Sequence, residues 1–149
     1  LHYIVDVSPG AFFRFSSILP FANSRKVLPK EAWFVAQIVA SQDADCGPCL
    51  QITVNLARKS GVDAALVRAA LDGKCEAMPT EMVDVLNFTK AVIGSTGEED
   101  TLRETLRARY GDRGLIELSY AIASSRIPPL VKRCLGYAKS CQLVTVDVP

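Results

Sequence analysis

The chain has 149 residues, the length of a single domain that buries roughly 68–70% of its unfolded surface without needing disulfides or metals. Its hydrophobic share of 49% argues against disorder, and a formal net charge of +1 shows no basic excess for nucleic acid or an anionic membrane. The single histidine, His2, excludes multi-histidine metal sites and disfavours a Ser-His-Asp triad. We therefore expect one domain, residues 1–149, with no nucleic-acid and no membrane partner.

The cysteine count favours a reducing compartment. Five cysteines are too few for a secreted disulfide scaffold of this length, and their odd number fits the cytosol better than the extracellular space. The apolar stretch 3–22 is interrupted by Asp6, Arg14 and two prolines, so it does not fit a membrane-spanning helix. The sequence predicts a cytoplasmic protein.

Proline and glycine divide the first half of the chain into four expected helices. In chain order, one begins at Ser8-Pro9 and closes at Pro20, one opens at Pro29, one restarts at Pro48 and stops at Gly61, and one runs from an Asp63 cap to Gly73. Residues 33–39 are apolar on nearly every side, which indicates that the second helix is buried.

The second half continues the helical pattern. In chain order, we expect a helix from Pro79 to Gly94, an acidic-started helix to Tyr110, a helix entered between Gly111 and Gly114, and a last helix whose apolar stripe includes Cys134 and Cys141. Pro128-Pro129 ends the third of these or starts the last. Only residues 143–148 look strand-like. The sequence thus predicts an all-α single-domain bundle of about seven or eight helices.

Chemistry is concentrated in the motif Cys46-Gly47-Pro48-Cys49. Two cysteines three residues apart can close a disulfide, and Pro48 places Cys49 near the start of a helix. The positive end of a helix stabilises a thiolate, which is the form that attacks peroxides and disulfides. The motif therefore predicts a redox-active dithiol preceded by an apolar helix.

Other interpretations of the cysteines stay open at the level of residues. Cys134 and Cys141 could complete an all-thiolate zinc site, although both are better explained as small core residues, and Cys75 as a bystander. Asp43 and Asp45 are expected to form a solvated, helix-capping loop beside the motif. A thioredoxin fold is disfavoured because the motif lacks flanking strands.

The helices and the dithiol together resemble the carboxymuconolactone decarboxylase-like family, in its alkylhydroperoxidase D (AhpD-like) branch. The similarity lies in residues 28–73: the proline-started helix with its early Glu31, the motif Cys46-x-x-Cys49, and the short capped helix 63–71. Residues 1–27 would then be an N-terminal arm. The resemblance implies a homo-oligomer, to which the phenylalanine-rich arm could contribute contacts.

The resemblance implies thiol-dependent reduction of alkyl hydroperoxides, a peroxiredoxin-like antioxidant activity. Carried over, Cys49 is the peroxidatic cysteine, Cys46 the resolving cysteine and Glu31 part of a proton relay, with no cofactor and no metal. An external thiol of unknown identity would supply electrons. Trp33, Phe34 and the arm could line an apolar approach for an organic peroxide, although core or subunit contacts explain them better.

One departure from the family pattern opens an alternative. The family histidine, four residues after the second cysteine, falls on Thr53, whose hydroxyl can donate a hydrogen bond but cannot act as a base near pH 7. The alternative is a catalytically weakened member that acts as a binding, structural or disulfide-exchange protein. A decarboxylase-branch enzyme is less well supported, because that branch does not depend on a CxxC pair.

Overall fold

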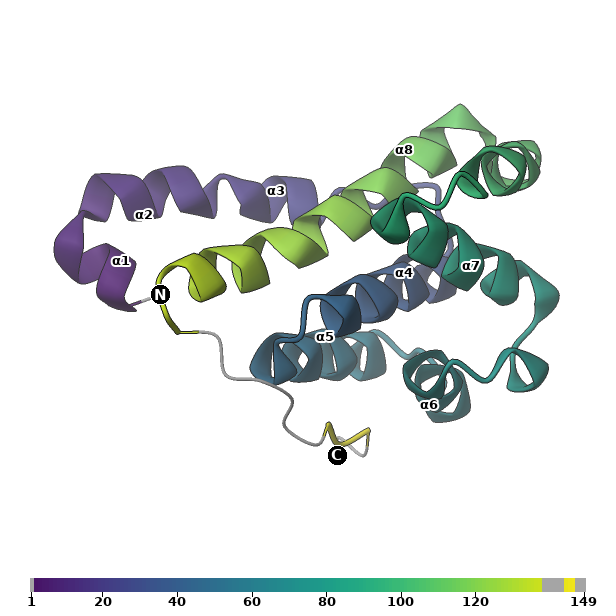
Figure 1. The fold of residues 1–149 in the computed structure, drawn as a ribbon, viewed down its shortest axis with the longest axis horizontal. Helices are drawn as coiled ribbons and strands as arrows, with labels where there is room; N and C mark the ends of the chain where they lie inside the picture. Colours follow the sequence, from purple (N-terminus) through teal and green to yellow (C-terminus); the bar gives the residue numbers. More distant parts are fainter. Residues whose placement is uncertain (1, 138–143, 147–149) are drawn as a thin grey trace.

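The computed structural model describes residues 2–137 and 144–146, and every regular element in them is helical (Figure 1). In chain order the elements are α1 (His2–Val7), α2 (Pro9–Ser16), α3 (Ile18–Ala22), α4 (Lys30–Asp43), α5 (Gly47–Lys59), α6 (Ala64–Asp72), the 3-10 turn η1 (Cys75–Ala77), α7 (Thr80–Gly94) and α8 (Glu99–Cys134). The all-α class expected from the sequence is confirmed. None of these helices combines the length and apolarity needed to cross a membrane within the described residues.

Local signals in the sequence set most helix ends. Ser8 caps α2 by accepting a hydrogen bond from the amide of Ala11. Asp63 caps α6 through the amides of Ala65 and Leu66, and Gly73 ends α6 in the left-handed conformation. These expected boundaries are confirmed.

Helix α4 is the centre of the bundle. It packs against α5, α6, α7 and α8 (Figure 1), and nine of its residues are buried. Because α4 is buried on all sides, its apolar residues are not confined to one face of the helix. Trp33 and Phe34 lie in this core at 4% and 8% exposure, so they do not line an open approach to any site.

Helix α8 covers the region where three helices were expected. Gly111 has a non-helical backbone (φ 69°, ψ 174°) that kinks the chain, so the expected boundary between Tyr110 and the next helix is confirmed. Beyond it the helix continues unbroken through Pro128-Pro129 to Cys134. The expected break at the two prolines is wrong. Pro129 is fully buried, and the packing that buries it holds the helix together where two backbone donors are missing.

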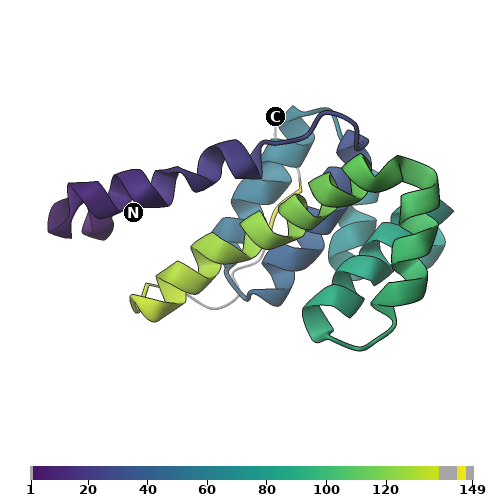
Figure 2. The same cartoon turned by 90° about the horizontal axis from the view of Figure 1, so that it is seen from above.

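The expected end at Pro20 is also wrong, because Pro20 lies inside α3. It occupies the first turn of that helix, where a backbone donor has no helical partner to lose. Helices α1 to α3 form an arm that contains no buried residue. Figure 2 shows this arm running out beyond the rest of the bundle, joined to it where α3 lies along α8.

A buried acid joins the arm to the bundle. The carboxylate of Glu117 in α8 accepts hydrogen bonds from the amides of Val27 (2.9 Å) and Leu28 (2.8 Å), in the segment that leads from the arm into α4. Burial alone would raise the pKa of Glu117, but the backbone donors Leu28, Val27 and Lys26, with the charge of Arg113, outweigh it. The pKa of Glu117 is therefore lowered, and the group is a structural carboxylate.

Candidate active site

Cys46 and Cys49 form a disulfide at the start of α5, with their Cα atoms 5.3 Å apart. Cys46 is the cap residue, and its carbonyl accepts hydrogen bonds from the amides of Cys49 and Leu50, both at 2.9 Å. Cys49 therefore lies in the first turn, at the positive end of the helix. The expected pairing of the two thiols at a helix N-terminus is confirmed.

The two cysteines differ in burial. Cys46 is 2% exposed, whereas Cys49 is half-buried, so Cys49 is the more exposed residue of the pair.

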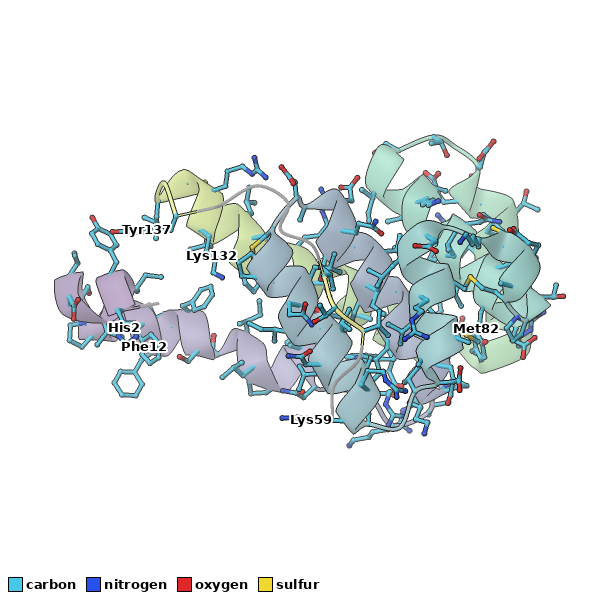
Figure 3. The ribbon with its side chains drawn as sticks, turned by 90° about the horizontal axis from the view of Figure 1, so that it is seen from below. His2, Phe12, Lys59, Met82, Lys132 and Tyr137 are labelled. Carbon is cyan, nitrogen blue, oxygen red and sulfur yellow. A yellow bond between two sulfur atoms is a disulfide. The ribbon has the colours of Figure 1, made fainter. Side chains whose placement is uncertain are left out.

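Lys132, which lies far along the chain from the motif, contacts the sulfur of Cys49. The ammonium group of Lys132, in the last two turns of α8, lies 3.4 Å from Sγ of Cys49 (Figure 3). An adjacent lysine favours the thiolate over the thiol and can also deliver a proton to a leaving group. Sequence reasoning missed Lys132, because the two residues are 83 positions apart and only the packing of α8 brings them together.

Two arginines of α8 hold the loop between α4 and α5. Arg126 pairs with Asp43, and Arg133 donates to the carbonyls of Ala44 (3.1 Å) and Asp45 (3.3 Å). Arg133 also lies 3.6 Å from the Asp45 carboxylate. The two acids expected in a solvated loop thus face cations, and their charge near the dithiol is offset.

This loop also contains a strained residue. Asp45 has a φ of 48°, in the left-handed region that residues other than glycine adopt at a cost of about 1 kcal/mol or more. The hydrogen bonds from Arg133 to the carbonyls on either side of its Cα fix this conformation. Since Cys46 follows directly, the loop sets the direction in which the motif leaves α4.

Thr53 lies one turn after Cys49, as the spacing requires, but its hydroxyl faces the backbone. It donates to the carbonyl of Cys49 (3.2 Å) and lies 3.3 Å from the hydroxyl of Ser41 in α4. Ser41 is 2% exposed. The hydroxyl pair therefore links α4 to α5 next to the disulfide.

Glu31 is not brought to the dithiol. It lies in the first turn of α4, beside Lys30 at 3.9 Å, whereas the motif follows the other end of that helix. Twelve residues of helix between Glu31 and Asp43 correspond to about 18 Å. Of the four residues expected at the site, the structure gathers Cys46, Cys49 and Thr53 and places Glu31 apart.

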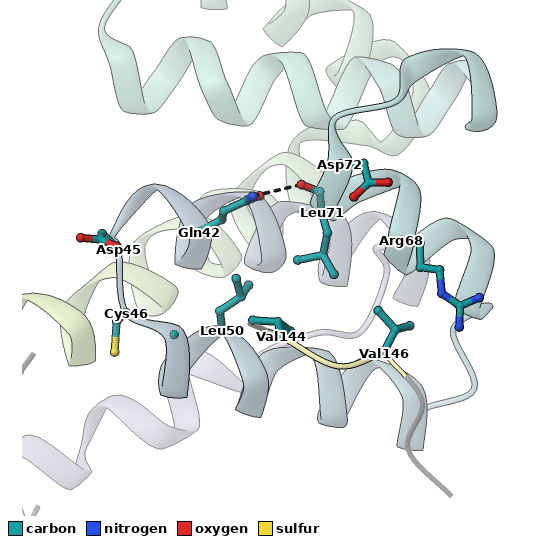
Figure 4. A pocket seen from close by; sticks show the side chains of 10 residues that line it. Gln42, Asp45, Cys46, Leu50, Arg68, Leu71, Asp72, Val144 and Val146 are labelled. Atoms are coloured by element: carbon teal, nitrogen blue, oxygen red, sulfur yellow. Dashed lines mark hydrogen bonds between the residues drawn. The ribbon is translucent and has the colours of Figure 1, made fainter. Parts of the chain in front are cut away.

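A hollow of about 530 Å³ adjoins the buried cysteine (Figure 4). Leu50 of α5 and Leu71 of α6 form its apolar walls, and Val144 and Val146 of the C-terminal segment close one side. Cys46 lines the same hollow. The strand-like segment of the sequence is thus packed against the bundle in its described part, residues 144–146, and forms no strand there.

The remaining cysteines do not converge on the pair in the described chain. Cys75 is half-buried and Cys134 is exposed, so the expectation that Cys134 belongs to a core stripe is wrong. Cys141 lies outside the described residues. Among residues 2–137 and 144–146, no three side chains of the metal-binding types are grouped to hold an ion.

Comparison with known proteins yields no relative. A scan against protein-family models found no match, and searches of curated sequences and of solved structures found none either.

Proposed function

We propose that this protein is a dithiol oxidoreductase of the AhpD-like kind, which reduces organic hydroperoxides at Cys49. The observation that carries the proposal is the contact between Lys132 and the sulfur of the half-buried Cys49, which is bonded to the buried Cys46. This arrangement supplies an accessible nucleophile, a cation that favours its thiolate, and an internal resolving thiol.

The proposed reaction proceeds in three balanced steps. The Cys49 thiolate attacks the terminal oxygen of the hydroperoxide, so that a sulfur–oxygen bond forms, the oxygen–oxygen bond breaks, and the alkoxide leaves with a proton from Lys132 or from water. The Cys46 thiol then attacks the Cys49 sulfenic acid, which closes the disulfide and releases water. Two equivalents of an external thiol reduce the disulfide and leave as their own disulfide.

Thiol counting and intact mass on the reduced protein test this assignment. After one equivalent of tert-butyl hydroperoxide, the wild type should lose two thiols, located at the pair by peptide mapping. Cys46→Ser should stop with one added oxygen on Cys49, and Cys49→Ser should leave Cys46 unmodified. If Cys49→Ser reacts as fast as the wild type, the assignment of the nucleophile is wrong.

Disulfide exchange is the second candidate, favoured by the position of Thr53. Its hydroxyl donates to a backbone carbonyl, so the acid–base group that the family places there is missing, whereas exchange needs only a thiolate and an accessible disulfide. Rapid reduction of a small aromatic disulfide by the reduced protein, together with peroxide turnover no faster than that of an ordinary thiol, would favour exchange over peroxide reduction.

A further inference from the structure

The side-chain amide of Gln51 pairs with the backbone of the C-terminal segment as a neighbouring β-strand would. The amide nitrogen of Gln51 donates to the carbonyl of Thr145 (2.8 Å), and the amide oxygen of Gln51 accepts from the N–H of Thr145 (2.9 Å). A residue that presents its N–H and its carbonyl to the same side has the extended conformation of a strand. Gln51 thus supplies the donor and the acceptor that a neighbouring strand would supply.

The orientation of the Gln51 amide is fixed from within α5. Its nitrogen also donates to the side-chain oxygen of Asn55, one turn later, at 2.8 Å. Two acceptors on one atom identify that atom as the nitrogen and leave the oxygen turned toward the segment. A residue of the same helix therefore fixes the orientation of the Gln51 amide.

The side chains of the segment alternate as in a half-buried strand. Val144 and Val146 pack against the core and line the hollow beside Leu50 and Leu71, whereas Thr145 is exposed (Figure 4). We call the surface formed by Leu50, Gln51, Asn55 and Leu71 the tail groove. It contacts two apolar side chains at alternate positions and the backbone between them, and its contact with the middle side chain is a single long one, 3.5 Å from the Thr145 hydroxyl to the Gln51 amide oxygen.

We propose that the tail groove is a binding site for one extended peptide segment of a partner protein, with small β-branched side chains at alternate positions. Residues 144–146 occupy it here as an internal stand-in. Recognition by backbone pairing with alternate side-chain pockets is how proteins add a strand-like peptide to an existing edge. The proposal goes beyond the dithiol chemistry and does not depend on it.

The contacts suit an occupant that can be exchanged. Two neutral hydrogen bonds contribute only about 1 kcal/mol each in water, and the two valines are half-buried rather than enclosed. A partner segment with the same pattern forms the same contacts and competes with the tail. Because Cys46 lines the same hollow, exchange would replace the wall beside the buried cysteine.

Two variants test the tail groove and the segment that occupies it separately. Thr145→Pro removes the N–H that pairs with Gln51 and leaves the groove intact, whereas Gln51→Ala removes the recognising amide. The probe is a fluorescent, end-blocked peptide of the sequence LVTVDV, residues 143–148. We expect Thr145→Pro to bind it roughly tenfold more tightly than the wild type, and the double variant Thr145→Pro with Gln51→Ala to bind it roughly thirtyfold more weakly than Thr145→Pro alone.

Two controls make the result specific. Thr145→Ala keeps the N–H and removes only the 3.5 Å contact between the Thr145 hydroxyl and the Gln51 oxygen, so it should bind the probe nearly as the wild type does. A peptide with both valines replaced by aspartate should not bind to Thr145→Pro. Equal affinity of wild type and Thr145→Pro, or no loss of affinity when Gln51→Ala is added to Thr145→Pro, would overturn the proposal.

Two further measurements cover the remaining outcomes. If Thr145→Pro does not fold, titration of the wild type with unlabelled peptide should shift the NMR signals of the Gln51 side-chain amide, and signals that stay in place would overturn the proposal. A wild-type mass that rises with concentration and returns to the monomer in Thr145→Pro would assign the groove to a second copy instead, which also overturns it.

Discussion

At the scale of residues, Cys49 differs from Cys46 in its surroundings, because it is half-buried and the ammonium group of Lys132 lies 3.4 Å from its sulfur. The motif predicted the disulfide and its place at a helix N-terminus, because three-residue spacing and the glycine–proline pair are local signals. It could not predict which cysteine is the more exposed, nor that Lys132 contacts Cys49. Both depend on how α8 packs, and no local pattern in residues 46–53 encodes that packing.

Replacing Lys132 with methionine should slow the reaction of Cys49 without unfolding the protein. One charge-assisted contact is worth about 1.5 kcal/mol or more, so the second-order rate constant with tert-butyl hydroperoxide should fall roughly tenfold at pH 7. The difference should shrink at high pH, where the thiolate forms without help. Stopped-flow kinetics on the reduced Cys46→Ser background measures this rate.

Lys59→Met is the matched control, because Lys59 is an exposed lysine at the other end of α5 (Figure 3). It should leave the rate constant unchanged. Identical rates for Lys132→Met and Lys59→Met would show that the contact with sulfur contributes nothing to reactivity.

Glu117 should make the fold sensitive to acid. Its pKa in the folded protein is lowered, so it contributes stability that is present above the unfolded value of about 4.3 and is lost as the pH falls through the folded pKa. Glu117→Gln should lower the free energy of unfolding by about 1–3 kcal/mol at pH 7 and flatten its decline in acid. Urea denaturation at pH 7 and below pH 4 measures both effects.

An exposed glutamate of the same helix provides the comparison. Glu104 pairs with Arg107 at the surface, and Glu104→Gln should change stability by less than about 1 kcal/mol at either pH. A Glu117→Gln variant with the same small effect would mean that the bonds to Val27 and Leu28 do not anchor the arm.

At the scale of elements, the sequence predicted helix ends correctly where a cap or a glycine determines them. It predicted them wrongly where tertiary packing determines whether a helix continues. Ser8, Asp63 and Gly73 act on their own turn, so their effect can be read locally. Pro128-Pro129 should end a helix by the same local reasoning, yet α8 continues because its buried side holds it. That continuity is what carries Lys132 and Arg133 to the dithiol.

The bend at Gly111 can be tested against another glycine. Its φ and ψ fall in a region open essentially to glycine alone, so Gly111→Ala should lower the free energy of unfolding by about 1–3 kcal/mol. Gly10 has an ordinary helical conformation with free space around it, and Gly10→Ala should be neutral or slightly stabilising. Thermal denaturation of both variants measures the contrast, and equal effects would contradict this account of the bend.

At the scale of the whole molecule, the arm leaves several large apolar side chains exposed to water. Phe13 is 75% exposed and Val7 67%, with no buried residue anywhere in α1 to α3. The motif resemblance led us to expect a homo-oligomer, and these side chains are where we expect its contacts. The sequence identified the arm as phenylalanine-rich but not its projection from the bundle.

Phe13→Ser should weaken this self-association. Burying one phenylalanine contributes about 1.5–3 kcal/mol, so the dissociation constant should rise by a factor of ten or more. Multi-angle light scattering should give the wild type a multiple of 16.2 kDa and give Phe13→Ser a lower average mass. A monomeric wild type would contradict the expectation that the arm mediates self-association.

The separation of Cys49 from Lys132 along the chain also has a consequence for biosynthesis. Translation adds roughly 5–20 residues each second, so the 83 residues between them take about 4–17 s to make. Throughout that interval the nascent chain carries a CxxC pair without Lys132 and Arg133. A ribosome that stalls before α8 therefore releases a product that has the motif but lacks the cation that contacts Cys49.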